Sequence, residues 1–148
     1  MAQRLTRPLG LTDYTQACGL WAVLSQEVGT KPAFSAVLNH PGTQLWGSFD
    51  GAQLRAMVTL HVLPNMTQAA RPYALIENVV SAPDARGQGH GRDAMQAAID
   101  AAWGAECYKI MLLTGQNTGA KGFYEALGFR ADQKFGLQMR RVPPRVPG

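Results

Sequence analysis

Apolar side chains at helical spacing lie near the start of the chain. In residues 11–28 (LTDYTQACGLWAVLSQEV) they recur at three- and four-residue steps, which predicts a helix that Thr12 or Asp13 could cap. Pro32 stands where a first-turn proline begins a helix, so we expect a second, short helix through about Leu38. Two helices are therefore predicted before the first strand signal.

The pattern then changes to the two-residue period of strands. Residues 43–49 (TQLWGSF) and 52–63 (AQLRAMVTLHVL) are joined by Asp50-Gly51, a strong signal for a tight β-hairpin. Residues 73–80 (YALIENVV) form a third expected strand. Its alternation places three side chains on one face: Leu75, Glu77 and Val79. Antiparallel pairing is the expected arrangement of the first two strands.

The second half of the chain mixes helices and strands. After a glycine-rich loop, one apolar stripe predicts a helix that ends at Gly104; its members are Met95, Ala98, Ile99 and Ala102. The continuous apolar run at 107–114 (CYKIMLLT) is typical of a strand that is covered on both faces. Residues 120–127 are expected to be helical, and 129–142 to form a last hairpin or strand pair. The predicted fold class is α+β, built around a mixed sheet.

Composition limits the number of domains and the classes of partner. A chain of 148 residues with 46% apolar and 16% charged residues fits one globular domain, 1–148, whose proline-rich end, 143–148, is expected to be loose. The net charge of +4 comes from scattered Lys and Arg, so we expect no nucleic-acid partner, and no apolar run reaches the length of a membrane span. Cys18 and Cys107 have no metal-ligand spacing and are expected to be reduced thiols of a cytoplasmic protein.

The segment SAPDARGQGHGRDAM, residues 81–95, places Gly87, Gly89 and Gly91 directly before a predicted helix. Glycine allows positive φ and a close approach of a ligand to the main chain, and the free N–H groups of a helix N-terminus attract anions. A dinucleotide-binding fingerprint would need G-x-G-x-x-G after a first strand, and a P-loop would need G-K-S or G-K-T; this segment has neither. The loop predicts a phosphate site, with an ordinary glycine-rich turn as the alternative.

A second motif lies downstream, in LLTGQNTGAKGFYEALGF. With it, the sequence resembles the GNAT superfamily of acyl-coenzyme A dependent N-acyltransferases. The family's glycine motif is matched by Arg86, Gly89 and Gly91. The later motif is matched by a second set: Asn117, Ala120, Phe123, Tyr124, Gly128 and Phe129. The resemblance covers roughly the second half of the chain. It implies a GNAT fold: a mixed, mostly antiparallel central sheet of about six to seven strands with helices on both faces, splayed between the fourth and fifth strands.

The resemblance implies acetyl-coenzyme A (acetyl-CoA) as the acyl-donor cosubstrate and no metal. The coenzyme's pyrophosphate would bind where the helix begins, at a run of seven residues: Arg86, Gly87, Gln88, Gly89, His90, Gly91 and Arg92. The pantetheine arm would pair like an extra strand with the backbone near Val79 and Val80. Asn117 resembles the family's asparagine that contacts this arm, and it could equally cap the following helix.

Two residues are candidates for proton transfer. Tyr124 matches the family's tyrosine beside the coenzyme A sulfur, where a phenol with a pKa of about 10 suits a thiolate leaving group. The alternative is a core aromatic whose hydroxyl binds the backbone. Glu77 is the candidate base for an amine that arrives as ammonium, because a carboxylate on an apolar strand is costly unless it has a function. A salt bridge or a place at the solvated end of the sheet is the alternative for Glu77.

The remaining polar candidates lie near the expected ligands. His90 stands between two glycines, and we expect an exposed side chain over the phosphates rather than a catalytic group. His61 and Arg71 could line the acceptor site, and Arg71 would suit an anionic acceptor, although a solvated loop arginine is the simpler alternative. Two loops should choose the acceptor, 28–33 and 65–71, and neither carries a readable pattern.

Three segments, LIENVV, CYKIMLL and GLQM, resemble the glucosamine 6-phosphate N-acetyltransferases within the superfamily. The chain departs from their pattern near the acceptor: it has Glu77-Asn78 where they carry Glu-Asp, and Ala120 where they place an asparagine. Asn78 is therefore a further candidate for contact with the substrate. The acceptor itself stays open at this point.

The expected reaction is transfer of an acetyl group to a primary amine of a small molecule, by direct attack in a ternary complex. The alternatives are a protein or peptide amine, glucosamine 6-phosphate as the specific acceptor, and, last, a non-catalytic acyl-CoA binding module. The resemblance also implies a homodimer joined through the C-terminal strands.

Overall fold

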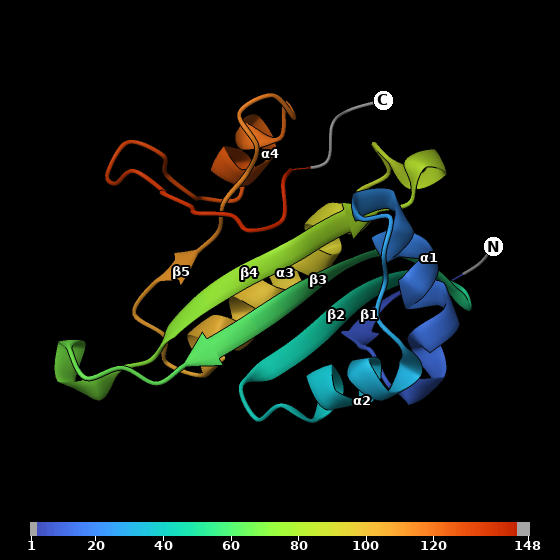
Figure 1. Ribbon diagram of the computed structural model, residues 1–148, viewed down its shortest axis with the longest axis horizontal. Coiled ribbons are helices and arrows are strands. Elements are labelled where there is room, and N and C mark those ends of the chain that lie inside the picture. Colours follow the sequence, from blue (N-terminus) through green and yellow to red (C-terminus); the bar gives the residue numbers. More distant parts are fainter. Residues whose placement is uncertain (1–2, 145–148) are drawn as a thin grey trace. The chain divides into compact units, whose positions relative to one another are not determined.

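The computed structural model describes residues 3–144, which divide into two compact units that part between Leu112 and Leu113. The larger unit contains one five-stranded sheet (Figure 1). Its strands lie in sequence order: β1 Arg4–Pro8, β2 Thr43–Asp50, β3 Gln53–Leu63, β4 Tyr73–Ser81 and β5 Ile110–Met111. The first four strands are antiparallel to their neighbours, and β5 runs parallel to β4.

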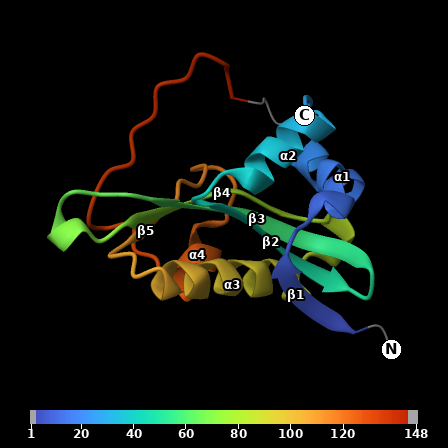
Figure 2. The ribbon, with the colours of Figure 1, turned by 90° about the horizontal axis from the view of Figure 1, so that it is seen from below.

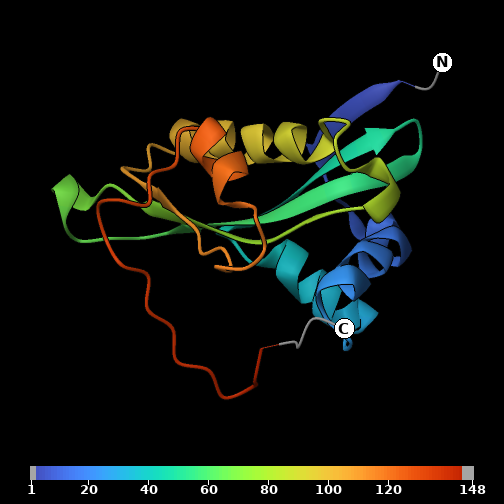
Figure 3. The ribbon, with the colours of Figure 1, turned by 90° about the horizontal axis from the view of Figure 1, so that it is seen from above.

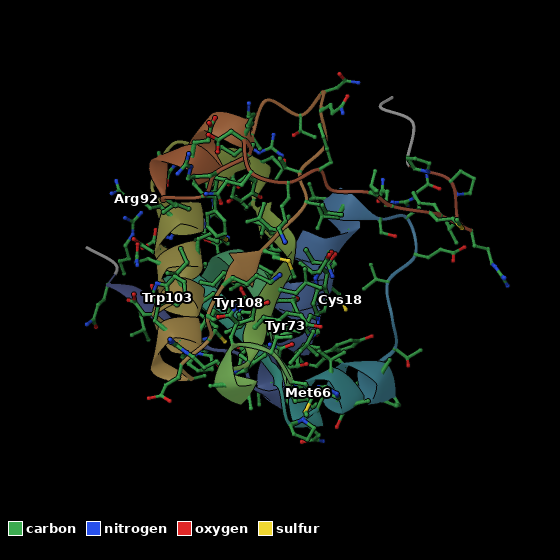
Figure 4. The ribbon with its side chains drawn as sticks, turned by 90° about the vertical axis from the view of Figure 1, so that its left-hand side faces the viewer. Cys18, Met66, Tyr73, Arg92, Trp103 and Tyr108 are labelled. Atoms are coloured by element: carbon green, nitrogen blue, oxygen red, sulfur yellow. The ribbon has the colours of Figure 1, made fainter. Side chains whose placement is uncertain are left out.

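Helices cover both faces of this sheet. The helices of the larger unit are α1 Tyr14–Leu24, α2 Lys31–Asn39 and α3 His90–Gly104. Figures 2 and 3 show α1 and α2 on one face and α3 on the other. Figure 4 shows the same division end-on, with Arg92 and Trp103 on α3 and Cys18 on α1 at the opposite side of the sheet. The smaller unit contains α4, Lys121–Ala126. Among the described residues, no helix is long and apolar enough to cross a membrane.

The two faces of the sheet are packed differently. On the α1/α2 face, large side chains from helices and strands form the core, among them Leu20, Phe34, Leu45, Phe49 and Met57. The predicted stripe of α3 is confirmed, because all four of its members are buried. Three of the six buried residues of α3 are alanines, so the helix lies close to the sheet.

One extra residue in β4 changes the register of the sheet. Thr59 of β3 pairs with Glu77, but Met57 pairs with Val80, so two steps on β3 oppose three steps on β4. Asn78 carries the bulge, with a φ of 52° in the left-handed region that asparagine tolerates better than most residues. The predicted alternation through Val79 is therefore wrong: the face that carries Glu77 continues at Val80.

β4 and β5 pair over a short distance only. The register joins Ala74 to Ile110 and Leu75 to Met111, and no further pair follows among the described residues. From Ile76 onward, β4 is paired on its β3 side alone. Pairing between the two strands ends at this point, and the expected splay stays a prediction.

The sequence patterns also led to errors at several boundaries. β1 was not predicted, α1 ends at Leu24 rather than near Val28, and the strand expected at 107–114 has two residues. Residues 129–142 form no strand in the described structure, so the sheet has five strands instead of six or seven. Of the tail expected to be loose, 145–148 lie outside the described residues.

Asp13 fixes the entry to α1. Its buried carboxylate accepts hydrogen bonds from Arg7 Nη1 and Nη2 at 2.8 and 3.0 Å, and from the Gly10 N–H at 2.8 Å. Asp13 is the N-cap residue of α1, as predicted, but its side chain makes no cap bond to that helix. The carboxylate instead connects β1 to the 3₁₀ turn Leu11–Asp13.

We predict that Asp13→Asn lowers the free energy of unfolding by about 1–3 kcal/mol at neutral pH, because hydrogen bonds to a charged partner are lost. The hydrogen bond with Arg7 holds the pKa of Asp13 below its ordinary value. Because the folded pKa is depressed, this stability is present above the unfolded pKa of about 4 and is lost as the pH falls through the folded pKa. Urea unfolding from pH 7 to pH 2 should therefore show the two proteins converging in acid.

The matched control is Asp100→Asn on the exposed side of α3, where the carboxylate accepts one hydrogen bond from Gln96 at 2.9 Å. This variant should unfold like the parent at every pH. A constant difference between Asp13→Asn and the parent down to pH 2 would contradict the role assigned to the Asp13 charge.

Candidate active site

The glycine-rich loop lies between the end of β4 and the start of α3. Gly87 and Gly89 have φ values of 78° and 89°, which L side chains rarely adopt, and Gly89 is the N-cap residue of α3. A Cβ on Gly89 would also lie 3.4 Å from Nη1 of Arg4. The backbone conformation therefore requires glycine at two of the three positions, before any ligand is considered.

Several main-chain N–H groups of this loop are free. Within residues 3–144, no hydrogen bond is made by the N–H groups of Gly87, Gly89, His90, Gly91 and Arg92. They stand at the positive end of a helix of 15 residues. Unpaired donors at a helix N-terminus bind anions, so the loop fits a phosphate group without a metal.

Arginine side chains surround these donors. Arg86 and Arg92 are exposed, and their guanidinium groups make no hydrogen bond or ion pair with the described residues. Arg4 of β1 donates to the Gln88 carbonyl and lies 3.5 Å from a carboxylate oxygen of Asp93. No sequence pattern points to Arg4, because only the folded sheet brings the N-terminal strand to the loop. These three cations add positive charge to the anion site.

Polar side chains hold the loop in place. Arg55 of β3 is buried and binds the Asp84 carboxylate at 2.8 Å, which lowers the pKa of Asp84. Gln88 Nε2 donates to the Asp84 carbonyl at 3.2 Å. The loop is thus tied to the sheet just after β4 ends.

His90 is buried, with 3% of its surface exposed, so the expected exposed side chain over the phosphates is wrong. Its Nδ1 lies 2.7 Å from the hydroxyl oxygen of Ser48 on β2. Burial lowers the pKa of His90, and Arg4 lowers it further. The neutral ring anchors the first residue of α3 to the sheet, while the His90 N–H stays free for a ligand.

Glu77 lies on the α1/α2 face of β4. It pairs with Thr59, which pairs in turn with Leu45 of the core on that face. The Glu77 side chain is exposed and has no hydrogen bond or ion pair within the described chain. The salt-bridge alternative therefore has no partner in the described structure. The exposure of Glu77 fits the other alternative, a solvated place on the sheet, and the expected cost of a buried carboxylate does not apply.

A pocket of about 250 Å³ lies on the same face, and Asn78 is its one residue from the sheet. The other walls come from the end of α1, the loop 25–30 and the start of α2, including Trp21 and Phe34. The bulge brings Asn78 to this pocket directly after Glu77. One of the two loops expected to choose the acceptor, 28–33, supplies part of the wall.

The structure places His61 and Arg71 away from this pocket. His61 Nδ1 lies 2.8 Å from the hydroxyl of Thr43, which also binds His40 Nδ1 at 2.8 Å. Arg71 Nε donates to the Glu106 carbonyl at 3.0 Å. The second acceptor loop, 65–71, lies at the end of the sheet opposite α1 (Figure 1). Neither side chain lines the pocket.

The smaller unit carries Tyr124 on α4. Its ring contacts Phe123 and Phe129, with centroids 5.1 and 6.2 Å apart, and burial raises the pKa of Tyr124. Gly128, with φ 106°, ends α4, and the Phe129 N–H bonds back to the Tyr124 carbonyl at 3.1 Å. The phenol has no hydrogen-bond partner among the described residues, so the alternative of a backbone-bonded core tyrosine does not apply.

Asn117 does not cap the helix that follows it. Ala120 is the N-cap residue of α4, and Thr118 accepts the Ala120 N–H at 3.4 Å. Asn117 is exposed in a turn with no hydrogen bond to the described residues. The helix-cap alternative for Asn117 is therefore wrong, and contact with the pantetheine arm stays a prediction.

The glycine-rich loop, the open edge of β4 and the pocket beside it all lie along one strand of the sheet. The family model described as Acetyltransferase (GNAT) family matches residues 11–129. The chain therefore belongs to the GNAT acetyltransferases. The donor used by this family is acetyl-CoA.

Individual relatives have the same fold as this chain, but they do not define its acceptor. A solved structure from Agrobacterium tumefaciens str. C58, classed as an acetyltransferase, is 39% identical with a TM-score of 0.86, over 93% of this chain and 99% of that one. The glucosamine-6-phosphate N-acetyltransferase of Arabidopsis thaliana has a TM-score of 0.80 at 18% identity, over 95% and 98% of the two chains, which shows the fold alone.

A curated relative from Trypanosoma brucei brucei is named glucosamine 6-phosphate N-acetyltransferase. It is 34% identical over 82 residues, which are 55% of this chain and 52% of that protein. The match thus spans about half the length of the relative.

We predict that Gly89→Val weakens acetyl-CoA binding at least tenfold, because a β-branched residue at φ 89° distorts the free N–H groups of the loop. Calorimetric titration with acetyl-CoA and with dephospho and desulfo analogues measures the effect. Thermal unfolding of the same variant shows whether the fold survives.

Gly104→Ala is the matched control, because its added Cβ has open space and no strained φ. This variant should bind acetyl-CoA like the parent. Unchanged affinity in a folded Gly89→Val protein would show that the loop is only a turn.

Proposed function

We propose that the protein transfers the acetyl group of acetyl-CoA to the primary amine of a small molecule by direct attack in a ternary complex. The observation that carries this proposal is the position of β4. The glycine-rich loop follows the end of this strand, its edge is open from Ile76, and its bulge at Asn78 lines a pocket. Donor and acceptor sites would therefore meet on one strand.

The donor would be held by the main chain. The free N–H groups at the start of α3 suit the pyrophosphate, and Arg86 and Arg92 add charge. The open edge of β4 near Val79 and Val80 suits an extended pantetheine arm, because an unpaired edge accepts an added strand. Asn117 is the proposed side-chain contact to that arm.

Glu77 is proposed as the base. An alkyl amine is mostly ammonium at neutral pH and must lose a proton before its nitrogen attacks the acetyl carbonyl. Glu77 is an unpaired carboxylate adjacent in sequence to the pocket residue Asn78, so it could accept this proton directly or through one water. Formation of the C–N bond and cleavage of the C–S bond then release a thiolate.

Tyr124 is proposed as the acid. Its raised pKa keeps the phenol protonated at neutral pH, and its hydroxyl is not held by another residue of the described chain. The phenol can donate its proton to the departing thiolate and be reprotonated from solvent. The two proton transfers are thus assigned to separate residues of the proposed single catalytic domain.

A homodimer through the C-terminal segment stays a prediction. Phe135, Leu137 and Met139 are exposed at alternate positions, as in a strand that lacks a partner. No strand forms there within the described residues.

We predict that Tyr124→Phe lowers kcat about a hundredfold, in the range expected when a general acid is lost. Affinity for acetyl-CoA and thermal stability should not change, because the hydroxyl has no partner among the described residues. Thiol release with a panel of amines gives kcat, and calorimetry gives the affinity. Tyr108→Phe serves as the control and should behave like the parent; equal turnover by Tyr124→Phe would remove the acid assignment.

For Glu77→Gln we predict a loss of rate that grows as the pH falls below neutral, because the fraction of free amine shrinks further and help from a base matters most. Glu77→Asp keeps a carboxylate and should restore part of the rate. The measurement is the pH profile of kcat/KM from pH 6 to 9. A profile of Glu77→Gln that is parallel to that of the parent would show that Glu77 is not the base.

A further inference from the structure

We propose that the pocket between α1, α2 and the bulge of β4 takes an amine carried on one compact apolar body, of the arylalkyl or branched-alkyl class. This inference rests on the proposed acetyl transfer and names its acceptor class. Sugar phosphates would be poor acceptors.

The walls of the pocket are predominantly apolar. Six of its eleven lining residues have apolar side chains: Trp21, Leu24, Val28, Ala33, Phe34 and Val37. Trp21 and Phe34 meet edge-to-face with centroids 5.9 Å apart, which gives the pocket a rigid aromatic wall. Such a surface gains free energy by burying an apolar ligand and gains little from a polyhydroxylated one.

The charge of the pocket favours a cation. Glu27 is the one ionisable residue that lines it, and its carboxylate makes no hydrogen bond or ion pair with the described residues. No Lys, Arg or His is among the lining residues. A phosphate would therefore enter without a counter-ion and next to a carboxylate, whereas an ammonium group is attracted.

Few polar groups remain for a ligand. The Ser25 hydroxyl donates to the Glu27 carbonyl at 2.9 Å, and the Thr30 hydroxyl accepts the Ala33 N–H at 3.4 Å. The Asn78 amide and the Glu27 carboxylate have no such partner within residues 3–144. Trp21 Nε1 is buried without an acceptor in the same part of the chain. This set can orient one amine but cannot satisfy a ring of hydroxyl groups.

The size of the pocket sets the size of the apolar body. A volume of about 250 Å³ is below the range of pockets for drug-sized ligands. One aromatic ring or a short branched chain fits this space. Because Asn78 follows Glu77, the amine end is assigned to the side of the bulge, where Glu77 is the proposed base.

The test uses the full chain and compares three amines as acceptors: 2-phenylethylamine, ethanolamine and glucosamine 6-phosphate. We expect kcat/KM for 2-phenylethylamine to exceed both others at least tenfold. Ala33→Leu fills the pocket from the first turn of α2 and should lower kcat/KM for 2-phenylethylamine at least tenfold while ethanolamine changes little. Ala33→Ser is the matched control of near-native size.

Charge is tested separately. Glu27→Gln should raise KM for 2-phenylethylamine about three- to fivefold, as expected for a partly solvated charge pair. Glu27→Asp keeps the charge, so its KM should be close to that of the parent. Binding of the amines without acetyl-CoA is followed by ligand-detected NMR in parallel.

The outcomes separate this inference from the proposed reaction. A preference for glucosamine 6-phosphate, or an Ala33→Leu protein that keeps its preference for 2-phenylethylamine, overturns the acceptor class while acetyl transfer stands. If no amine is turned over, but 2-phenylethylamine binds and Ala33→Leu weakens that binding, the proposed reaction is overturned and the assignment of the pocket is supported. If 2-phenylethylamine is neither turned over nor bound, both the acceptor class and the proposed reaction are overturned.

Discussion

The one extra residue in β4 is the constraint on which the rest of the site depends. A bulge bends its strand and increases the local twist, and it leaves one residue without a ladder partner. Here the extra residue is Asn78, and the last pair between β4 and β5, at Leu75, lies two residues before Glu77. The bulge also aims Asn78 at the pocket on the α1/α2 face. A single insertion in the register thus accompanies both the open edge of β4 and the contact of Asn78 with the pocket.

The proposed anion site depends on how firmly the glycine-rich loop after β4 is held. Free N–H groups bind an anion well only when they are fixed in direction before it arrives. The loop is fixed by Arg55 on Asp84, by Ser48 on His90, and by Arg4 on the Gln88 carbonyl. Three different strands therefore hold one loop. Burial of a neutral His90 ring contributes packing without adding a charge that would need its own partner.

Short-range sequence patterns predicted local structure well. They failed where contact with a distant strand decides how a residue is placed. The Asp50-Gly51 hairpin and the apolar stripe of α3 are short-range patterns, and both are confirmed. The two-residue alternation of side chains along the strand could not reveal the bulge at Asn78, because nothing in YALIENVV marks the extra residue. His90 looked exposed between two glycines, since its partner Ser48 lies 42 positions away. The free loop N–H groups, in contrast, were expected, because a glycine-rich loop precedes a predicted helix.

Family membership constrains the two halves of the reaction unequally. The proposed donor site consists mainly of free main-chain N–H groups between Gly87 and Arg92, so it depends on the backbone more than on side chains. The proposed acceptor pocket is lined by side chains such as Trp21, Phe34 and Glu27, which can change without altering the backbone. A relative's acceptor can therefore differ from that of this chain even at a TM-score of 0.80. The walls of the pocket are stronger evidence on the acceptor than the name of any relative.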